Sequence, residues 1–393
     1  MSEPITYAVA ADQIFDGSKT HKDAAVVVEG SKILALVPPN KVPTHITIHS
    51  VAPGHWLAPG FIDVQVNGGG DVLFNNSPTS NAITRILQAH RNFGTTALLP
   101  TLITDTLEKM TAAIAAAEAL AGREPGLLGV HLEGPYLSPE KAGVHDPNFM
   151  RVPSEADWEM LFSRRKIALI VTLAPERVPE GFIRRLATAG VRVSLGHSVA
   201  TYDETRKAIS EGLTGFTHLF NAMAPLTSRE PGPIAAALET SKVWFGLIVD
   251  GFHVSPAMLR LALRGYGHPM LVTDAMPPVG GSRETFKIYD SEVTVLNECC
   301  LRSDGTLAGT ALNMAVAIRN CVRLLGVSLE EALGFASRNP AEFLGLGHLL
   351  GKLAPNYRAD MVAFDPESLT VSETWVAGSH KLSEETPPGR IYH

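Results

Sequence analysis

The strongest constraint on the fold of this chain is an alternation of strand-length apolar runs with longer helical stretches between residues 57 and 274. The runs are FIDVQV (61–66), TALLPT (96–101), LLGVHLE (127–133), IALIVTL (167–173), VRVSLGH (191–197), GFTHLF (215–220), FGLIVD (245–250) and MLVTD (270–274). The stretches SNAITRILQAHRNF and LEKMTAAIAAAEALAG between them carry the three- and four-residue apolar spacing of helices. Eight strand-helix units close a (β/α)8 barrel, so the sequence predicts a TIM-like barrel over residues 57–349.

The two ends of the chain have a different character. YAVAADQIF and AAVVVEGSKILALV near the start, and GKLAPNYRADMVAFDP near the end, read as strands separated by polar turns. An isolated pair of strands is marginally stable in water. We therefore expect residues 1–56 and 350–393 to form one small β-sandwich domain beside the barrel.

Composition excludes several classes of function. The formal charge is −7 and no basic run suits a phosphodiester backbone, so nucleic acid is not expected as a partner. A small anionic substrate stays compatible, since one or two arginines can bind a phosphate. Three cysteines, two of them adjacent, favour a reduced, cytoplasmic protein. Neither a signal peptide nor a membrane-spanning run is apparent, so no membrane partner is expected.

Ionisable residues stand where the predicted barrel strands end. Glu133 ends the third strand, His197 the fifth and Asp274 the eighth, while His218 lies near the end of the sixth and His253 follows the seventh. The carboxyl ends of barrel strands converge on one mouth, where barrel enzymes carry out their chemistry. The five side chains are therefore expected to meet.

Two imidazoles and a carboxylate form a common ligand set for a catalytic divalent ion. Glu133, His197 and His218 are thus the predicted metal ligands, and Asp274 is the predicted general base toward a metal-activated water. Taken singly, each residue has an ordinary alternative: a histidine in an apolar strand usually packs, and an acid after a strand often caps a turn. Five coincidences at strand ends are a weaker explanation than one site.

Ordered motifs along nearly the whole chain give these residues a context. They are APGFIDVQVNGGG (58–70), HLEGPYLSPEKAGVHDPNF (131–149), SLGHS (194–198), THLFNAM (217–223), SREPG (228–232), DGFHVSP (250–256), LVTDA (271–275) and GTLAGTALNM (305–314). With them the chain resembles the amidohydrolase superfamily and, within it, the N-acetylglucosamine-6-phosphate deacetylases. This resemblance implies deacetylation of N-acetyl-D-glucosamine 6-phosphate to D-glucosamine 6-phosphate and acetate, in amino-sugar catabolism and cell-wall sugar recycling.

The resemblance also implies roles for individual residues. Glu133, His197 and His218 match the family's metal ligands, Asp274 its catalytic aspartate and His253 its carbonyl-polarising histidine. The family's substrate contacts fall on Val144, His145, Asn221, Ala222, Arg229, His253, Leu307, Ala308 and Gly309. The arginine matching Arg229 reaches phosphate across a dimer interface in relatives, which implies a homodimer. From the residues alone, Arg229 could equally be a surface arginine paired with Glu230.

One departure from the wider superfamily concerns the first barrel strand. Many members carry His-X-His there, which helps to hold a second metal, whereas this chain has Gln65 and Asn67. Amides are poor zinc ligands compared with imidazole, so we expect one divalent ion per subunit, with Zn²⁺ favoured and Fe²⁺, Co²⁺ or Mn²⁺ as alternatives. Two other readings stay open: an amidohydrolase acting on a cyclic amide or an N-acyl amino acid, and a metal-free scaffold protein.

Overall fold

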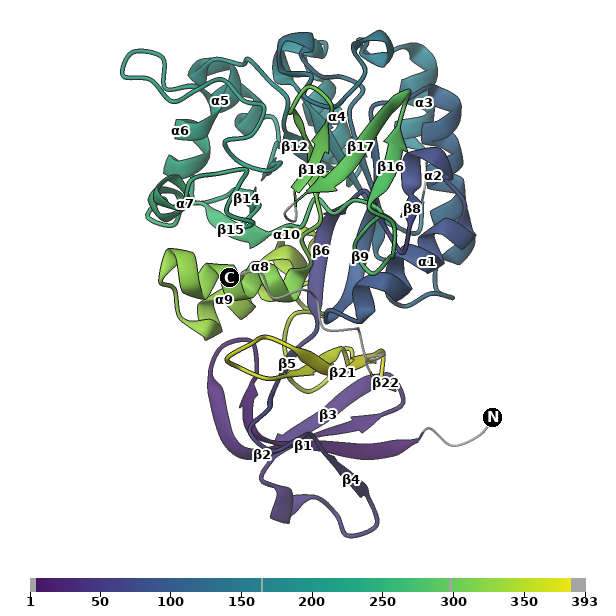
Figure 1. The fold of residues 1–393 in the computed structure, drawn as a ribbon, viewed down its shortest axis with the longest axis vertical. Coiled ribbons are helices and arrows are strands. Elements are labelled where there is room, and N and C mark those ends of the chain that lie inside the picture. The colour runs from purple at the N-terminus through teal and green to yellow at the C-terminus, as the bar shows by residue number, and fades with distance from the viewer. Residues whose placement is uncertain (1–4, 164, 297–298, 383–393) are drawn as a thin grey trace.

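The structure, a computed structural model, describes residues 5–163, 165–296 and 299–382 and contains the expected barrel (Figure 1). Its parallel strands pair in chain order: β6 (Phe61–Val66), β9 (Thr95–Ile103), β10 (Gly129–Glu133), β11 (Ala168–Leu173), β12 (Arg192–Leu195), β13 (Gly215–Phe216), β14 (Trp244–Leu247) and β15 (His268–Leu271). Past β15, the Asp274 N–H donates to the Gln65 carbonyl at 3.0 Å and Ala275 bridges Val66, which closes the ring. The barrel prediction is confirmed.

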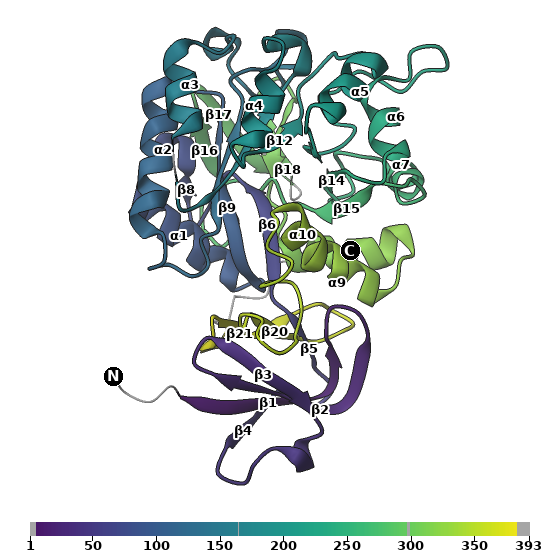
Figure 2. The same ribbon diagram turned by 180° about the vertical axis from the view of Figure 1, so that it is seen from behind.

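Helices cover the outside of the ring, as Figure 2 shows from behind. They are α1 (Ser80–Arg91), α2 (Leu107–Leu120), α3 (Glu155–Phe162), α4 (Phe182–Thr188), α5 (Tyr202–Ser210), α6 (Gly232–Glu239) and α7 (Pro256–Ala262). Side chains of Thr79, Thr106, Ser154 and Thr201 cap four of them at the N-terminus. One face of each barrel strand packs against helices and the other face points into the barrel interior. Strands such as β9 are therefore buried along their whole length and appear in the sequence as continuous apolar runs.

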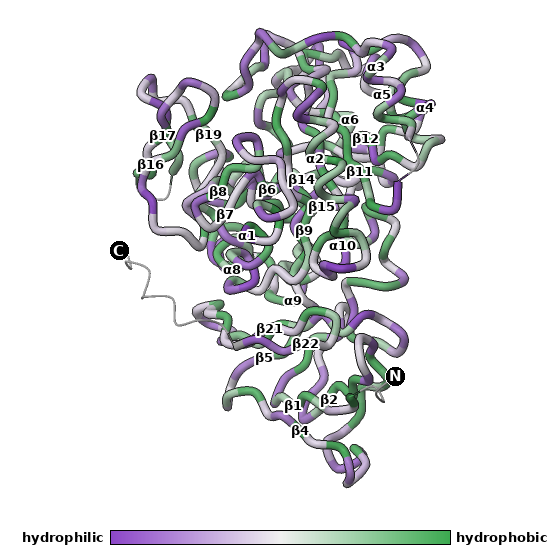
Figure 3. The backbone as a smooth tube through the Cα atoms, turned by 90° about the vertical axis from the view of Figure 1, so that its right-hand side faces the viewer, coloured by the Kyte–Doolittle hydropathy of each residue, from purple (hydrophilic) through white to green (hydrophobic). Residues whose placement is uncertain are grey.

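A four-stranded antiparallel sheet follows the last barrel strand and was not predicted. It consists of β16 (Thr285–Ile288), β17 (Ser291–Leu296), β18 (Cys299–Arg302) and β19 (Leu307–Thr310). Figure 3 shows it projecting from the upper part of the barrel. The Thr310 N–H donates to the Asp274 carbonyl at 3.0 Å, so β19 ends against the residue predicted to be the base. Cys299 and Cys300 lie on β18 and are buried.

Strands from the two ends of the chain form a separate sheet, which belongs to the small domain and is called the small sheet below. It contains β1 (Thr6–Phe15), β2 (Thr20–Glu29), β3 (Lys32–Val37), β4 (Thr47–Ser50), β5 (Trp56–Pro59), β20 (Met361–Phe364), β21 (Val371–Val376) and β22 (Ser379–Leu382). Antiparallel pairing of β5 with β20 joins the N-terminal to the C-terminal strands. Val9, Val26, Met361 and Trp375 are buried in one common core.

The small sheet lies below the barrel in Figure 1, with helices α8 (Met314–Asn320), α9 (Leu329–Ala336) and α10 (Arg338–Phe343) between them. A single residue separates the end of β5 from the start of β6, so the amino ends of the barrel strands face the small sheet and the carboxyl ends point away. The domain limits at 56/57 and 349/350 stay a prediction, and residues 1–4 and 383–393 of the expected small domain lie outside the described residues. Among the helices of the described chain, none has the length and apolar character needed to cross a bilayer.

Candidate metal centre and catalytic cavity

Three predicted ligands meet at the carboxyl ends of the barrel strands. Glu133 Oε1 lies 3.1 Å from His197 Nε2 and 2.9 Å from His218 Nε2. The two Nε2 atoms are themselves 3.1 Å apart. Exposed fractions of the side chains are 2% for Glu133 and 6% for each histidine. Three donor atoms therefore face a common point in a nearly dry environment.

The backbone and its neighbours fix how the imidazoles are presented. His197 Nδ1 lies 2.7 Å from the Lys141 carbonyl and can only donate to it, which leaves the Nε2 lone pair facing the cluster in the neutral ring. His197, His218 and Asp274 have φ values of 48°, 32° and 52°. This left-handed region is uncommon for residues other than glycine, and such strain is concentrated at functional sites.

The charges within the triad depend on one another. Burial opposes ionisation of Glu133, but hydrogen bonds from His197 and His218 outweigh it and hold the pKa of Glu133 well below its usual value. Burial also opposes protonation of His218, yet its hydrogen bond and attraction to Glu133 raise the pKa of His218. A negative carboxylate between two imidazoles thus favours a bound positive charge. A divalent cation supplies that charge without a proton.

Asp274 lies beside the triad, held by the two amides that replace His-X-His. Its Oδ1 accepts from Asn67 Nδ2 at 2.6 Å and from Gln65 Nε2 at 3.1 Å. Gln65 Nε2 also lies 3.3 Å from Glu133 Oε2 and so links the two acids. Burial and the charge of Glu133 raise the pKa of Asp274 to about 6. A carboxyl with a pKa in this range can both accept and return a proton near neutrality.

His253 faces the same cavity and is fixed from behind by Asp250. Its Nδ1 lies 2.6 Å from Asp250 Oδ2, while Asp250 Oδ1 accepts from the backbone N–H groups of Phe252 and His253. Burial opposes ionisation of Asp250, but the hydrogen bond and charge of His253 lower its pKa. An ionised Asp250 would stabilise an imidazolium that can donate from Nε2. Asp250 was not predicted from the sequence; its three-residue spacing from His253 was the available signal.

These groups surround a cavity of about 190 Å³. Among the predicted substrate residues, those that line it are Val144, His145, Asn221, Ala222, His253, Leu307 and Gly309. Ala308 is fully buried in a neighbouring apolar cluster and does not line the cavity. Arg229 lies in the exposed 225–230 loop, away from the cavity lining. Glu230 accepts from the backbone N–H groups of Tyr202 and Gly232, so its carboxylate is engaged within its own loop region.

His145 is a buried lining residue beside the metal triad. Its Nδ1 lies 2.8 Å from Thr104 Oγ1, and its Nε2 is 3.9 Å from Glu133 Oε1. Burial, followed by repulsion from His197, holds the pKa of His145 well below its usual value. This imidazole is therefore neutral and offers a hydrogen-bonding edge rather than a charge. The apolar lining residues Ile103, Ile248 and Met276 were not predicted, since nothing in their local sequence separates them from core residues.

Comparison with known proteins places this arrangement in context. The amidohydrolase family model matches residues 56–387. The N-acetylgalactosamine-6-phosphate deacetylase of Shewanella sp. (strain ANA-3) is 44% identical, over 82% of each chain. The N-acetylglucosamine-6-phosphate deacetylase of Haemophilus influenzae is 32% identical over 92% of this chain and 95% of its own. The crystal structure of the N-acetylglucosamine-6-phosphate deacetylase from Pasteurella multocida matches with a TM-score of 0.92 and 35% identity, covering 96% of this chain and 100% of that chain.

Proposed function

The chain belongs to the amidohydrolase family, and on that premise we propose that it is a metal-dependent deacetylase of N-acetyl-D-glucosamine 6-phosphate. The products are D-glucosamine 6-phosphate and acetate. One observation carries the proposal: Glu133, His197 and His218 present three donor atoms to one point, with the Asp274 carboxyl beside them on a shared cavity. The reaction would serve amino-sugar catabolism and cell-wall sugar recycling. A cytoplasmic location is in keeping with the three buried cysteines, none of which forms a disulfide.

Glu133, His197 and His218 would hold one divalent ion, and their donor set suits Zn²⁺ or another borderline ion such as Fe²⁺, Co²⁺ or Mn²⁺. Such an ion supplies Lewis-acid activation of water and polarisation of the amide carbonyl. The amides of Gln65 and Asn67 serve Asp274 instead of a second metal. One ion per subunit is therefore proposed for catalysis.

Asp274 acts as the general base and then as the general acid. Its carboxylate takes a proton from the attacking water and returns it to the leaving amine, which is otherwise too basic to depart. Gln65 and Asn67 hold Oδ1, which orients the carboxylate while the second oxygen stays available. His253, kept in place by Asp250, donates to the carbonyl oxygen as negative charge develops there.

The sugar phosphate requires a cationic partner in addition to the metal and His253, which serve the amide. Within the described part of the chain, neither lysine nor arginine lines the cavity. Arg229 lies on an exposed loop and has the planar fork that suits a phosphate. The proposal therefore includes a homodimer in which Arg229 of one copy reaches the neighbouring active site. Val144, His145, Asn221, Ala222, Leu307 and Gly309 form the remaining sugar contacts, and Ala308 supports the turn between Leu307 and Gly309 from the apolar cluster behind it.

A second substrate is favoured by a specific finding, because the relative with 44% identity acts, by its name, on the galactosamine epimer. The two sugars differ only in the orientation of one hydroxyl group, so the polar groups that line the cavity must distinguish the two orientations. Acetate release should be measured with both N-acetylhexosamine 6-phosphates and with their unphosphorylated forms. The ratio of kcat/KM for the two epimers assigns the natural sugar.

The same assay tests the proposal as a whole. Activity should disappear on chelation and return with Zn²⁺, and the phosphorylated sugars should exceed the unphosphorylated ones in kcat/KM. Equal kcat/KM values for the phosphorylated and unphosphorylated sugars would mean that the enzyme does not recognise the phosphate. Hydrolysis of a cyclic amide or an N-acyl amino acid, with neither sugar phosphate turned over, would favour the other amidohydrolase reading. Metal content far below one equivalent after growth with zinc would favour the scaffold reading.

A further inference from the structure

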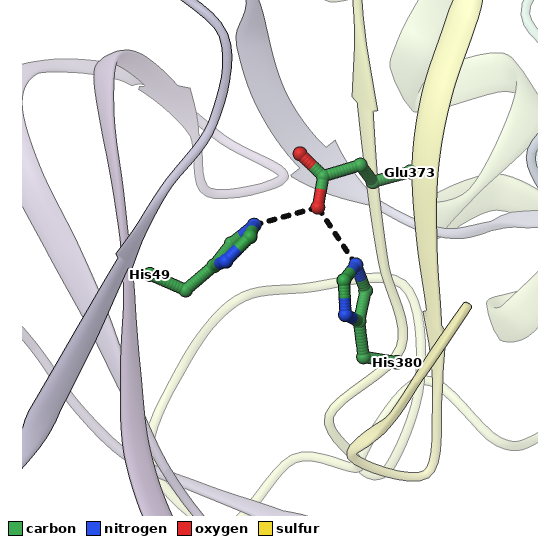
Figure 4. A group of neighbouring side chains, drawn as sticks. All are labelled: His49, Glu373 and His380. Carbon is green, nitrogen blue, oxygen red and sulfur yellow. Dashed lines mark hydrogen bonds and ion pairs between the residues drawn. The ribbon is translucent and has the colours of Figure 1, made fainter. Parts of the chain in front are cut away.

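A second cluster of two histidines and one glutamate lies in the small sheet, far from the barrel mouth. His49 comes from β4, Glu373 from β21 and His380 from β22. Figure 4 shows both imidazoles pointing at one carboxylate oxygen of Glu373. Glu373 Oε2 lies 2.6 Å from His49 Nε2 and 2.7 Å from His380 Nε2. In the described part of the chain, only this cluster and the barrel triad bring three such ligand atoms within 4.8 Å of one another.

Neighbouring groups hold the two rings in this orientation. The indole of Trp375 stacks on His380 at a centroid distance of 4.7 Å and an interplanar angle of 17°. The same indole meets His49 edge-on at 5.9 Å. Trp375 is 1% exposed and belongs to the core of the small domain, so it is a rigid support. Supporting contacts of this kind orient imidazole ligands in metal sites.

The glutamate of this cluster is buried, whereas its two histidines are partly exposed to solvent. The side chain of Glu373 is 8% exposed, whereas those of His49 and His380 are 40% and 34% exposed. Water can therefore reach the outer edge of both rings and fill open coordination positions. In a neutral ring the hydrogen can sit on Nδ1 instead of Nε2, and the Nδ1–H then donates a hydrogen bond to water. This leaves two Nε2 lone pairs and one carboxylate oxygen as ligands, and no net proton release is needed.

We propose that His49, Glu373 and His380 form a second, non-catalytic binding site for a borderline divalent ion, with Zn²⁺ as its first candidate. Two imidazoles and a carboxylate are ligands that Zn²⁺ accepts, with water completing the shell. An ion bound there joins β4 of the N-terminal segment to the C-terminal hairpin β21–β22. It stabilises the folded small domain, since it binds the folded chain and not the separated strands. The site does not depend on the proposed activity.

Zinc stoichiometry tests this site directly. The untagged full-length protein is stripped with a chelator, equilibrated with Zn²⁺, passed through a desalting column and assayed for bound metal. We expect two equivalents per chain for the native sequence and one for His380→Gln and for His49→Gln/His380→Gln. His45→Gln is the matched control: His45 is an exposed histidine on the same segment, and this variant should keep two equivalents.

A variant of the barrel triad separates the two sites. Glu133→Gln/His197→Gln should bind one equivalent, and Zn²⁺ should still raise its Tm; adding His380→Gln should abolish both effects. Circular dichroism and acetate release verify that the small-domain variants are folded. One equivalent in the native protein that is unchanged by His380→Gln would overturn the site. Equal metal loss in His45→Gln, or binding seen only at millimolar zinc, would overturn it as well.

Discussion

The barrel triad and the small-domain triad contain the same three side chains in two different environments. Side chains of the barrel triad are 2% to 6% exposed, and its members lie at the carboxyl ends of three separate barrel strands. In the small domain the histidines are 34% and 40% exposed, and two of the three ligands come from one hairpin. Electrostatic interactions strengthen as water is excluded. Two imidazoles and a carboxylate are enough to bind a metal ion, whereas catalysis also needs a buried site and a nearby acid-base group such as Asp274.

Removing that partner should give the largest effect. Asp274→Asn keeps the hydrogen-bonding shape but cannot take a proton, so kcat should fall by at least about 10²–10⁴-fold. Metal content should stay at the native value, because the three ligands are intact. Steady-state acetate release and metal analysis on the same preparation measure both. Loss of metal along with turnover would make Asp274 chiefly a ligand.

The next effect concerns stabilisation of charge on the carbonyl oxygen. His253→Ala removes one donor and should lower kcat by about 10²–10³-fold with a smaller change in KM. The small-domain triad has no counterpart of this donor. A rise in KM at constant kcat would instead mean that His253 binds substrate and transition state equally.

Asp250 should act through His253 and matter less. Asp250→Asn replaces a charged hydrogen-bond acceptor with a neutral one, and loss of a charge-assisted bond worth about 1.5–3 kcal/mol corresponds to a fall in kcat of up to about tenfold or more. The split between kcat and KM distinguishes this from a purely structural role, because the hydrogen bond from His253 matters most as negative charge develops on the carbonyl oxygen. The loss should therefore fall on kcat, with little change in KM. A rise in KM at constant kcat would leave Asp250 without this positioning role.

Burial of the barrel triad should also appear as proton release on metal binding. The pKa of Asp274 is raised to about 6 by burial and Glu133, and the pKa of His218 is raised by Glu133 against the effect of burial. Near about pH 6 these groups hold protons that a cation displaces, and near about pH 8 fewer protons remain. Proton release should therefore be present near about pH 6, measured by calorimetry in buffers of different ionisation enthalpy; above about pH 7, ionisation of the metal-bound water adds a separate proton. His49→Gln/His380→Gln is used so that only the barrel site contributes; the absence of proton release near about pH 6 contradicts the assignment.

The smallest effect is expected in the small domain. Metal-free His380→Gln should lose about 1 kcal/mol or less of unfolding free energy, because the pair with Glu373 is partly exposed. Its kcat should equal that of the native enzyme. Urea unfolding of both proteins after chelation measures the difference. A large loss of turnover would mean that the two regions are coupled.

Much of the barrel and its site could be predicted from the sequence. Strands such as β6 and β9 are buried on both faces, so they appear as unbroken apolar runs, and parallel strands bring their carboxyl ends together whatever the loops do. Polar residues at those ends therefore had to meet. Glu133, His197, His218 and Asp274 were found in this way.

Other features depend on the folded backbone. The left-handed conformations of His197, His218 and Asp274 are imposed by surrounding structure against their local preference. The use of Gln65 and Asn67 to hold Asp274 could be recognised only once the ring had closed between β6 and the residues after β15. The position of Arg229 on an exposed loop, and the sheet β16–β19, likewise follow from packing that short apolar patterns do not specify.

The periodicity of the barrel and the order of the acids and imidazoles along it can be read from the chain alone, because burial selects apolar residues at regular intervals. Which distant polar groups become neighbours depends on the folded arrangement of the strands. His49 and Glu373 are 324 residues apart and meet because β5 pairs with β20, bringing the two ends of the chain into one sheet. Local sequence patterns carry no record of such a contact, since its geometry depends on the long-range pairing of strands.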